Sequence, residues 1–312
     1  MKELRKDYFL EEFVLVSPDD DVDRYFSTNN KSSDDSCSIC KLDTSDNIIK
    51  TEVLSFFELE TSHIDAKNVS NIEQKTQKTI YIADKSHKKI NKLSISKLFK
   101  LLKTTQSVYT DMISTDMKNL QIIINSGQYA GGNSVHNGIE ISNFPIPPPV
   151  LVDEINSSKQ TLLDLGICPM CRIINLETGG PRQIISTVNF FAFCPWASTY
   201  SFEFWIYPKS HQSSFSSLNV QELEDLAQIL RSTLGGMDNI LKNPSYSLVF
   251  HNSLNEPDGE LHWHIEIYPK LIPKNGFENG FGIYVNTISP EKSAEILGKA
   301  SRKELASLVG VI

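Results

Sequence analysis

The chain has 312 residues, of which 40% are hydrophobic and 9% aromatic, so it can form one large domain or two ordinary ones around a real core. Its net charge of −8 argues against a general nucleic-acid or membrane-surface binder. The start, MKELRKDYFLEEF, has no apolar signal-peptide core, and no run approaches the ~18 apolar residues of a membrane-spanning helix, so we expect a cytoplasmic protein without a membrane partner.

The predicted elements occur twice in the same order. A Cys-x-x-Cys pair comes first, at Cys37 and Cys40 and again at Cys168 and Cys171. An apolar stretch that ends in a histidine follows, IYIADKSH at 80–87 and FWIYPKSH at 204–211. Each is followed by an amphipathic helix. The apolar face of these helices holds Ile95, Leu98, Leu102, Tyr109 and Met112 in the first, and Val220, Leu223, Leu226, Leu230 and Leu234 in the second, behind Ser217 or Asn219 as the cap.

Two predicted strands close each unit. The first strand is NLQIIIN at 119–125 and YSLVFHN at 246–252, and the second is HNGIEI at 136–141 and HWHIEI at 262–267. The chain is therefore a duplication of one α+β unit. We predict an N-terminal domain at 1–150 and a C-terminal domain at 151–312, joined through PIPPPVLVDEINSSKQ.

Each unit carries a set of cysteine and histidine residues that suits a metal ion. In a reducing compartment a Cys-x-x-Cys pair indicates a metal site or a redox motif, and the polar loop before Cys37 favours the metal. Two histidines lie further along each unit, and thiolate with imidazole is the donor set of tetrahedral zinc. The alternative is that His87 and His211 are ordinary surface residues. The fifth cysteine, Cys194 in FAFCPW, is predicted to be a buried free thiol.

Several segments resemble the galactose-1-phosphate uridylyltransferase family of the histidine-triad superfold, and especially its two-zinc subgroup, which includes the ADP-glucose phosphorylases. The segments are ELRKDYFLEEFVLVSP, NSGQYAGGNSVH, FEFWIYPKSH, HWHIEIYPK and NGFENGFGIYVN. The resemblance implies an α+β fold of two histidine-triad-like units, each a mainly antiparallel sheet with packed helices. It also implies a homodimer and a nucleotide sugar or sugar phosphate as ligand.

The same resemblance implies site residues. Two Zn²⁺ ions per chain would be held by Cys37, Cys40, His87 and His136 and by Cys168, Cys171, His211 and His262. Glu278 matches the glutamate that contacts the sugar hydroxyls. Asn125 and Asn133 would touch a ligand, and backbone N–H groups near Gly131 could face an anion, although that signal is weak without a lysine or a following helix.

The family's reacting group is missing. Its first-half strand has the pattern His-x-His-x-Gln, in which the middle histidine becomes nucleotidylated and the glutamine stabilises charge on the phosphate. Gly138 and Glu140 stand at these two positions here. The arginine- and lysine-rich turn that holds the phosphates is replaced by SPDDDVDRYF, in which Arg24 is the one cation, and the asparagine-aromatic-proline segment has no match near VLSFFELETSH. The usual nucleotide pocket is therefore predicted to be dismantled.

The second half retains groups that could react. Catalytic candidates are His264, Glu266 and Glu140; the first two could instead shape the pocket or support the metal. His251 at a strand end could reach the same cavity, but such a histidine is more often a structural residue. A reaction at His264 would need cations nearby, for which Lys209, Lys270 and Lys274 are candidates, although single lysines near loops are more often solvated.

Two functions remain open from the sequence. One is a relative of the hexose-1-phosphate nucleotidyltransferases and phosphorylases that acts on a nucleotide sugar or sugar phosphate by a changed mechanism. The other is a catalytically silent zinc protein that binds a nucleotide, a sugar phosphate or a protein partner.

Overall fold

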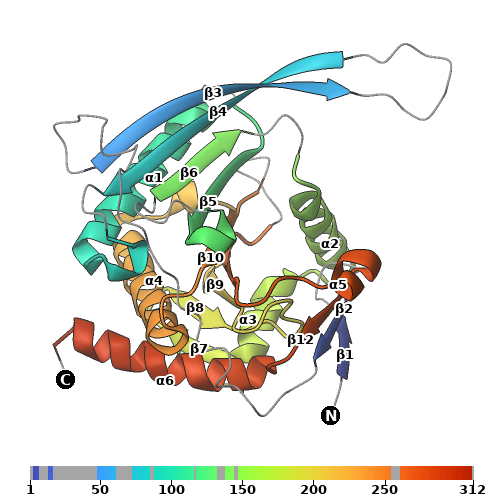
Figure 1. Ribbon diagram of the computed structural model, residues 1–312, viewed down its shortest axis with the longest axis vertical. Coiled ribbons are helices and arrows are strands. Elements are labelled where there is room, and N and C mark those ends of the chain that lie inside the picture. The colour runs from blue at the N-terminus through green and yellow to red at the C-terminus, as the bar shows by residue number, and fades with distance from the viewer. Residues whose placement is uncertain are drawn as a thin grey trace.

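The computed structural model describes residues 3–6, 13–16, 48–60, 72–84, 88–115, 117–131, 138–143, 147–253 and 261–310. A nine-stranded sheet forms its centre (Figure 1). The strands, in order across the sheet, are β3 (Ile48–Glu60), β4 (Ile72–Asp84), β6 (Gly138–Asn143), β5 (Leu120–Ser126), β10 (Tyr246–His251), β11 (His264–Pro269), β9 (Phe204–Pro208), β8 (Phe190–Phe193) and β7 (Gln183–Ser186). Every neighbouring pair is antiparallel, and helices pack on the sheet, so the predicted α+β class is confirmed.

The order of the strands displays the duplication. Strands β5 and β10 meet at the centre, where Phe250 lies opposite Ile122. Moving outward from this junction, β6, β4 and β3 follow on one side, while β11, β9 and β8 follow on the other. The two predicted units are therefore joined edge to edge into one continuous sheet. The domain boundary at residue 150 stays a prediction.

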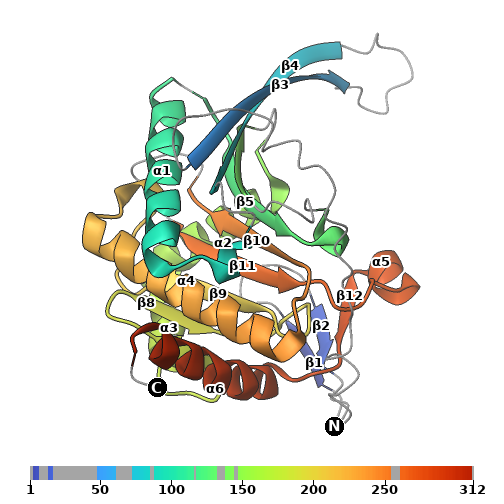
Figure 2. The same cartoon turned by 60° about the vertical axis from the view of Figure 1, so that its left-hand side comes forward.

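Three helices cover one face of the sheet (Figure 2): α1 (Ile95–Ser114), α4 (Val220–Leu241) and α6 (Pro290–Leu308). The predicted apolar faces of α1 and α4 point into the core, except that Val220 is 46% exposed. Val220 is the first helical residue, directly after the cap Asn219, whose side chain accepts the N–H of Glu222. Asn219 is therefore the cap; Ser217 ends the preceding 3₁₀ turn.

The opposite face of the second half is covered by α2 (Pro149–Leu165) and α3 (Pro169–Glu177). Helix α2 lies within the predicted linker and starts on Pro149, where the missing N–H of proline costs nothing. Met170 and Ile174 of α3 pack against aromatic side chains of β8 and β9. The linker is thus a structural helix, and it carries the buried Glu154 towards the sheet.

A second, three-stranded sheet joins two N-terminal strands to a strand of the second half. Strands β1 (Glu3–Lys6) and β2 (Phe13–Val16) are antiparallel, and β2 runs parallel to β12 (Ile283–Asn286), which follows α5 (Gly276–Phe281) (Figure 1). Among the described residues, no helix has both the length and the apolar character needed to cross a bilayer.

Candidate functional site

The four predicted metal ligands of the second half converge on one point. Cys168 precedes α3 and Cys171 lies in its first turn, while His211 follows β9 and His262 precedes β11. Their ligand atoms all lie within 4.8 Å of one another. The Cys171 Sγ atom is 3.8 Å from His211 Nδ1 and 3.5 Å from His262 Nδ1. Residues up to 94 positions apart in the chain thus form the set that the sequence predicts.

The orientation of His262 suits metal binding. This side chain is fully buried, and its Nε2–H donates to the carbonyl of Pro208 at 2.8 Å. Because a carbonyl can only accept, the proton is placed on Nε2 and the lone pair of Nδ1 is directed towards Cys171. Metal-binding histidines commonly donate their second nitrogen to a carbonyl in this way. The donor set therefore fits a tetrahedral zinc ion.

The two cysteines differ in pKa, and the lower value belongs to Cys168. Burial raises the pKa of the Cys168 thiol, but hydrogen bonds with His211 and His262 lower it by more, so that the resulting pKa is about 5. Burial and the neighbouring Cys168 raise the pKa of Cys171 to about 12. This pair lies at a helix start, where a redox motif would also be expected. The two imidazoles beside it favour the metal.

The first-half metal set lies outside the described residues. Cys37, Cys40, His87 and His136 all fall there, and so does the ligand candidate Asn133. The predicted first zinc site therefore stays a prediction. The fifth cysteine is described: Cys194 is a free thiol with no exposed surface, as expected, and burial raises its pKa well above the ordinary value.

A second group of possible metal ligands is buried in the second half: Glu154, His251, His264 and Glu266. The Nδ1 atom of His251 is 2.9 Å from Glu154 Oε2, and its Nε2 is 3.4 Å from Glu266 Oε2. His251 is thus a partnered structural residue, as the sequence suggested. Glu154 was not predicted, because nothing in its helical surroundings marks it in the sequence.

His264 is held on all sides. It is 1% exposed, its Nδ1 contacts the carbonyl of His262 at 3.2 Å, and its Nε2 contacts Glu266 Oε1 at 3.2 Å. The ring of Tyr207 stacks on it, with centroids 4.3 Å apart and planes at 11°. Burial lowers the pKa of His264 well below its ordinary value. A neutral ring can donate to only one of these two oxygen atoms, so burial, rather than two hydrogen bonds, keeps His264 away from a bound phosphate.

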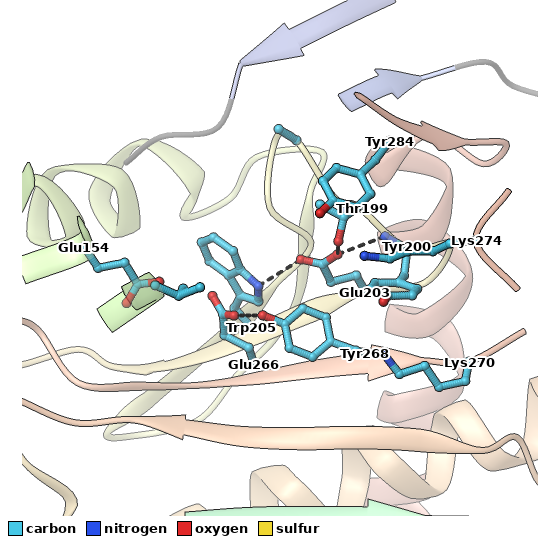
Figure 3. Close-up of a pocket in the computed structure, with 12 residues that line it drawn as sticks. Glu154, Thr199, Tyr200, Glu203, Trp205, Glu266, Tyr268, Lys270, Lys274 and Tyr284 are labelled. Atoms are coloured by element: carbon cyan, nitrogen blue, oxygen red, sulfur yellow. Dashed lines mark hydrogen bonds between the residues drawn. The ribbon is translucent and has the colours of Figure 1, made fainter. Parts of the chain in front are cut away.

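Next to this cluster lies a cavity of about 220 Å³ (Figure 3). It is lined by Val150, Glu154, Ala197, Thr199, Tyr200, Glu203, Trp205, Glu266, Tyr268, Lys270, Lys274 and Tyr284. Two of the predicted cation candidates meet here. The Lys270 Nζ atom is 4.1 Å from the centroid of the Tyr200 ring, and the Lys274 Nζ atom is 4.2 Å from that of Tyr284.

The carboxylates of this cavity are occupied, whereas its lysines are not ion-paired. One oxygen of Glu203 accepts the N–H of Thr199 at 2.7 Å, and the other accepts Trp205 Nε1–H at 3.1 Å. Within the part of the chain that the structure describes, Lys270 and Lys274 form no ion pair. Burial lowers the pKa of Lys274, but the tyrosines beside it raise it by more. The cavity therefore holds two ammonium groups without an ion pair beside three carboxylates that already have partners.

Lys209, the third cation candidate, lies elsewhere. It is exposed, follows β9 and donates to the carbonyl of Thr187. It does not line this cavity.

The first-half motif strand is β6, which carries Gly138 and the catalytic candidate Glu140. Gly138 lies opposite Ala83 of β4, and Glu140 lies opposite Tyr81. Gly138 is buried, and a Cβ atom built on it would lie 2.4 Å from Cζ and 2.7 Å from Oη of Tyr81. The phenol ring therefore fills the space that a side chain at 138 would take. Glu140 is half-buried, and burial raises its pKa.

The remaining ligand candidates have the following places. Asn125 is half-buried in β5, opposite Ser247. Gly131 ends a 3₁₀ turn with φ of 72°, a left-handed conformation that favours glycine. Glu278 caps its own helix α5, since Oε2 accepts the N–H of Asn275 at 2.8 Å and Oε1 that of Val285 at 3.2 Å. Contact of these residues with a sugar stays a prediction.

Similarity to known proteins was found in sequence and in structure, although no family model matches the chain. The ADP-glucose phosphorylase of Arabidopsis thaliana is 30% identical over 187 residues, which are 58% of this chain and 52% of that protein. The galactose-1-phosphate uridylyltransferase of Thermotoga maritima is 26% identical over 191 residues, 58% of this chain and 60% of that protein. The matched region thus spans about half the length of these curated relatives.

Solved structures share the fold over nearly the whole chain. A crystal structure of the Arabidopsis thaliana ADP-glucose phosphorylase with bound ADP-glucose has a TM-score of 0.76 at 23% identity and covers 96% of this chain and 98% of that one. A uridylyltransferase structure has a TM-score of 0.77 at 23% identity and covers 97% and 99%. At this identity the likeness shows the fold.

Proposed function

The chain is related to the galactose-1-phosphate uridylyltransferases and the ADP-glucose phosphorylases, and from that premise we propose that it binds a nucleotide sugar or a sugar phosphate without forming a nucleotidyl-histidine. The relatives are named for nucleotide-sugar chemistry, and one is solved with ADP-glucose bound. Among the functions that the sequence left open, this is the catalytically silent one with a small-molecule ligand.

The observation that carries the proposal is the state of the two motif strands. Position 138 on β6 is a glycine, so it has no nucleophile, and the ring of Tyr81 occupies the space beside it. The corresponding His264 on β11 is 1% exposed, does not line the cavity, and has both ring nitrogens facing oxygen atoms of the protein. A phosphoramidate needs a free imidazole nitrogen within reach of phosphorus. Among the described residues, neither strand supplies one.

The cavity beside β11 is the place we propose for the ligand. Its two lysines would attract a phosphate, while the hydroxyl oxygens of Tyr200 and Tyr284 would accept hydrogen bonds from the hydroxyl groups of a sugar. At about 220 Å³ the cavity is smaller than the ~300–1,000 Å³ of typical sites for drug-sized ligands. It therefore suits the sugar phosphate end of a ligand better than a whole nucleotide sugar.

We further propose that Cys168, Cys171, His211 and His262 hold one zinc ion and that the first-half set holds a second. Four protein ligands close the coordination shell, so the ion would contribute folding free energy and no open position for a substrate. The buried group around His251 could hold a metal ion as well. A homodimer and a cytoplasmic location stay predictions.

Calorimetry and intact-mass measurement test the proposal together. We expect UDP-glucose, ADP-glucose or glucose 1-phosphate to bind, with no nucleotide monophosphate added to the protein and no turnover. The pair Lys270→Gln/Lys274→Gln should weaken glucose 1-phosphate binding about 10-fold or more, whereas the matched pair Lys118→Gln/Lys303→Gln, on exposed sites, should leave it unchanged. Failure of all three compounds to bind would reject the proposal. A nucleotide adduct mapped to His264 would show instead that the second half has taken over the reaction.

A further inference from the structure

The ring of Tyr81 lies over the strand on which a relative would carry its reacting group. Ile80 and Ile82 of β4 turn towards the core beneath α1, so Tyr81 between them points to the opposite face. Ile139 and Ile141 of β6 are likewise buried in that core, which places Gly138 and Glu140 on the same face as Tyr81. The ring leans from its own partner Glu140 across to Gly138.

The equivalent positions of the second half explain why the ring can take this place. The stretch IYIADKSH corresponds to FWIYPKSH, so Tyr81 matches Trp205 and Ala83 matches Tyr207. In the second half Tyr207 stacks on His264, and the ring of Trp205 also lies beside His264, with centroids 5.8 Å apart, while its N–H donates to Glu203. In the first half both members of that stack are small, Ala83 and Gly138. The space they leave is filled by the neighbouring ring.

We propose that Tyr81 closes the first-half motif strand to ligands, so that the cavity beside β11 is the site left open for them. A phosphate on β6 would have to approach Gly138, and the atoms of the phenol ring already occupy the 2.4–2.7 Å shell around the position of a Cβ there. The inference rests on the proposed function only in treating β6 as the former motif strand. An aromatic ring over a glycine is also a way of packing a sheet. Measuring how accessible position 138 is to a small reagent distinguishes these two roles.

Alkylation of a thiol placed under the ring measures that access. The thiol introduced by Gly138→Cys should react with N-ethylmaleimide roughly 10-fold faster or more when Tyr81→Val is added than when Tyr81 is retained. Tyr81→Phe should behave like the unaltered residue, because the ring and not the hydroxyl provides the cover. A thiol introduced by Gly276→Cys, in open space, should react at the same rate in all three backgrounds. Equal rates for the thiol at 138 with and without Tyr81 would overturn the proposal.

A double-mutant cycle measured by melting temperature provides a second test if the cysteine variant folds poorly. Gly138→Ala should lower the melting temperature by roughly 3–10 °C, since overpacking a filled site is destabilising. With Tyr81→Val present, the same alanine should cost clearly less. A cost at 138 that Tyr81→Val does not change would show that the ring is not its source, and the absence of any cost would show that the ring moves aside freely; either result would overturn the proposal. Neither measurement uses a ligand, so absence of nucleotide-sugar binding would reject the proposed function and leave this inference standing.

Discussion

The two motif strands, β6 and β11, occupy the same place in their halves but are packed in opposite ways. On β11 a histidine is kept and stacked under Tyr207. On β6 the histidine and its stacking partner are replaced by Gly138 and Ala83, and a third residue, Tyr81, fills the volume. Protein interiors do not tolerate voids of this size cheaply. This packing supports the proposal that Tyr81 closes the first-half strand to ligands.

The glutamates two residues further along each strand also differ in their surroundings. Glu266 on β11 is 3% exposed and holds His251, His264 and Tyr268 by its two oxygens. Glu140, at the matching position on β6, is only half-buried, and burial without a compensating charge raises its pKa. Glu266 thus belongs to a buried network with two histidines, whereas Glu140 has no histidine beside it among the described residues. The two strands therefore differ in whether their carboxylate is part of a buried polar cluster.

Removing the second-half metal set should have the largest effect on the molecule. Structural zinc contributes on the order of 10 kcal/mol in small peptides, so Cys168→Ser/Cys171→Ser should lower the melting temperature by roughly 10 °C or more. Metal analysis should fall from about two zinc ions per chain to one. The matched pair Cys37→Ser/Cys40→Ser should remove the other ion. Unaltered protein that contains no zinc would disprove both sites.

His136→Ala tests whether the first half keeps a metal without keeping a reaction. This histidine lies outside the described residues, and the resemblance makes it the fourth ligand beside Cys37, Cys40 and His87. The variant should lose one metal ion and several degrees of melting temperature, while ligand binding at the second-half cavity is retained. A variant with full metal content and unchanged melting would mean that the first ligand set is wrongly assigned.

Introducing the first-half residues at the matching second-half positions tests directly whether the two strands differ in packing. Tyr207→Ala/His264→Gly reproduces Ala83 and Gly138. Trp205 already lies beside His264, with ring centroids 5.8 Å apart, and its N–H is held by Glu203, so we expect it to leave much of the vacated space unfilled. We expect a loss of about 3–5 kcal/mol in the free energy of unfolding, measured by urea titration, because the cavity stays open. Tyr207→Phe keeps the ring and is the control. A loss below about 1 kcal/mol would indicate that the second half refills as easily as the first.

The smallest expected effect is the pH dependence of Glu140→Gln. A carboxyl whose pKa is raised by folding binds its proton more tightly in the folded state. Its contribution to stability is present below the unfolded pKa and is lost as the pH rises through the folded pKa. The glutamine variant should therefore melt slightly higher than the unaltered protein at pH 7, and the gap should close towards pH 4. Glu224→Gln, at an exposed site on α4, should show no such gap. A gap that widens on acidification would contradict the burial of Glu140.

Much of the fold and one metal set were predictable from local patterns. The repeated order of elements, the helices around Leu98 and Leu223, and the loss of a nucleophile at Gly138 all follow from periodicity and motif spacing. The second-half metal ligands were predictable for the same reason, since both copies of the unit repeat them.

Only the tertiary structure decided what surrounds those residues. Glu154 reaches His251 across 97 positions from a helix in the predicted linker. Lys270 and Lys274, each ordinary in sequence, meet over the rings of Tyr200 and Tyr284. The sequence displays the glycine at 138 but not the tyrosine that covers it, because the direction in which a ring leans depends on the free volume around it. That volume is set by side chains from several strands at once, and no local pattern records it.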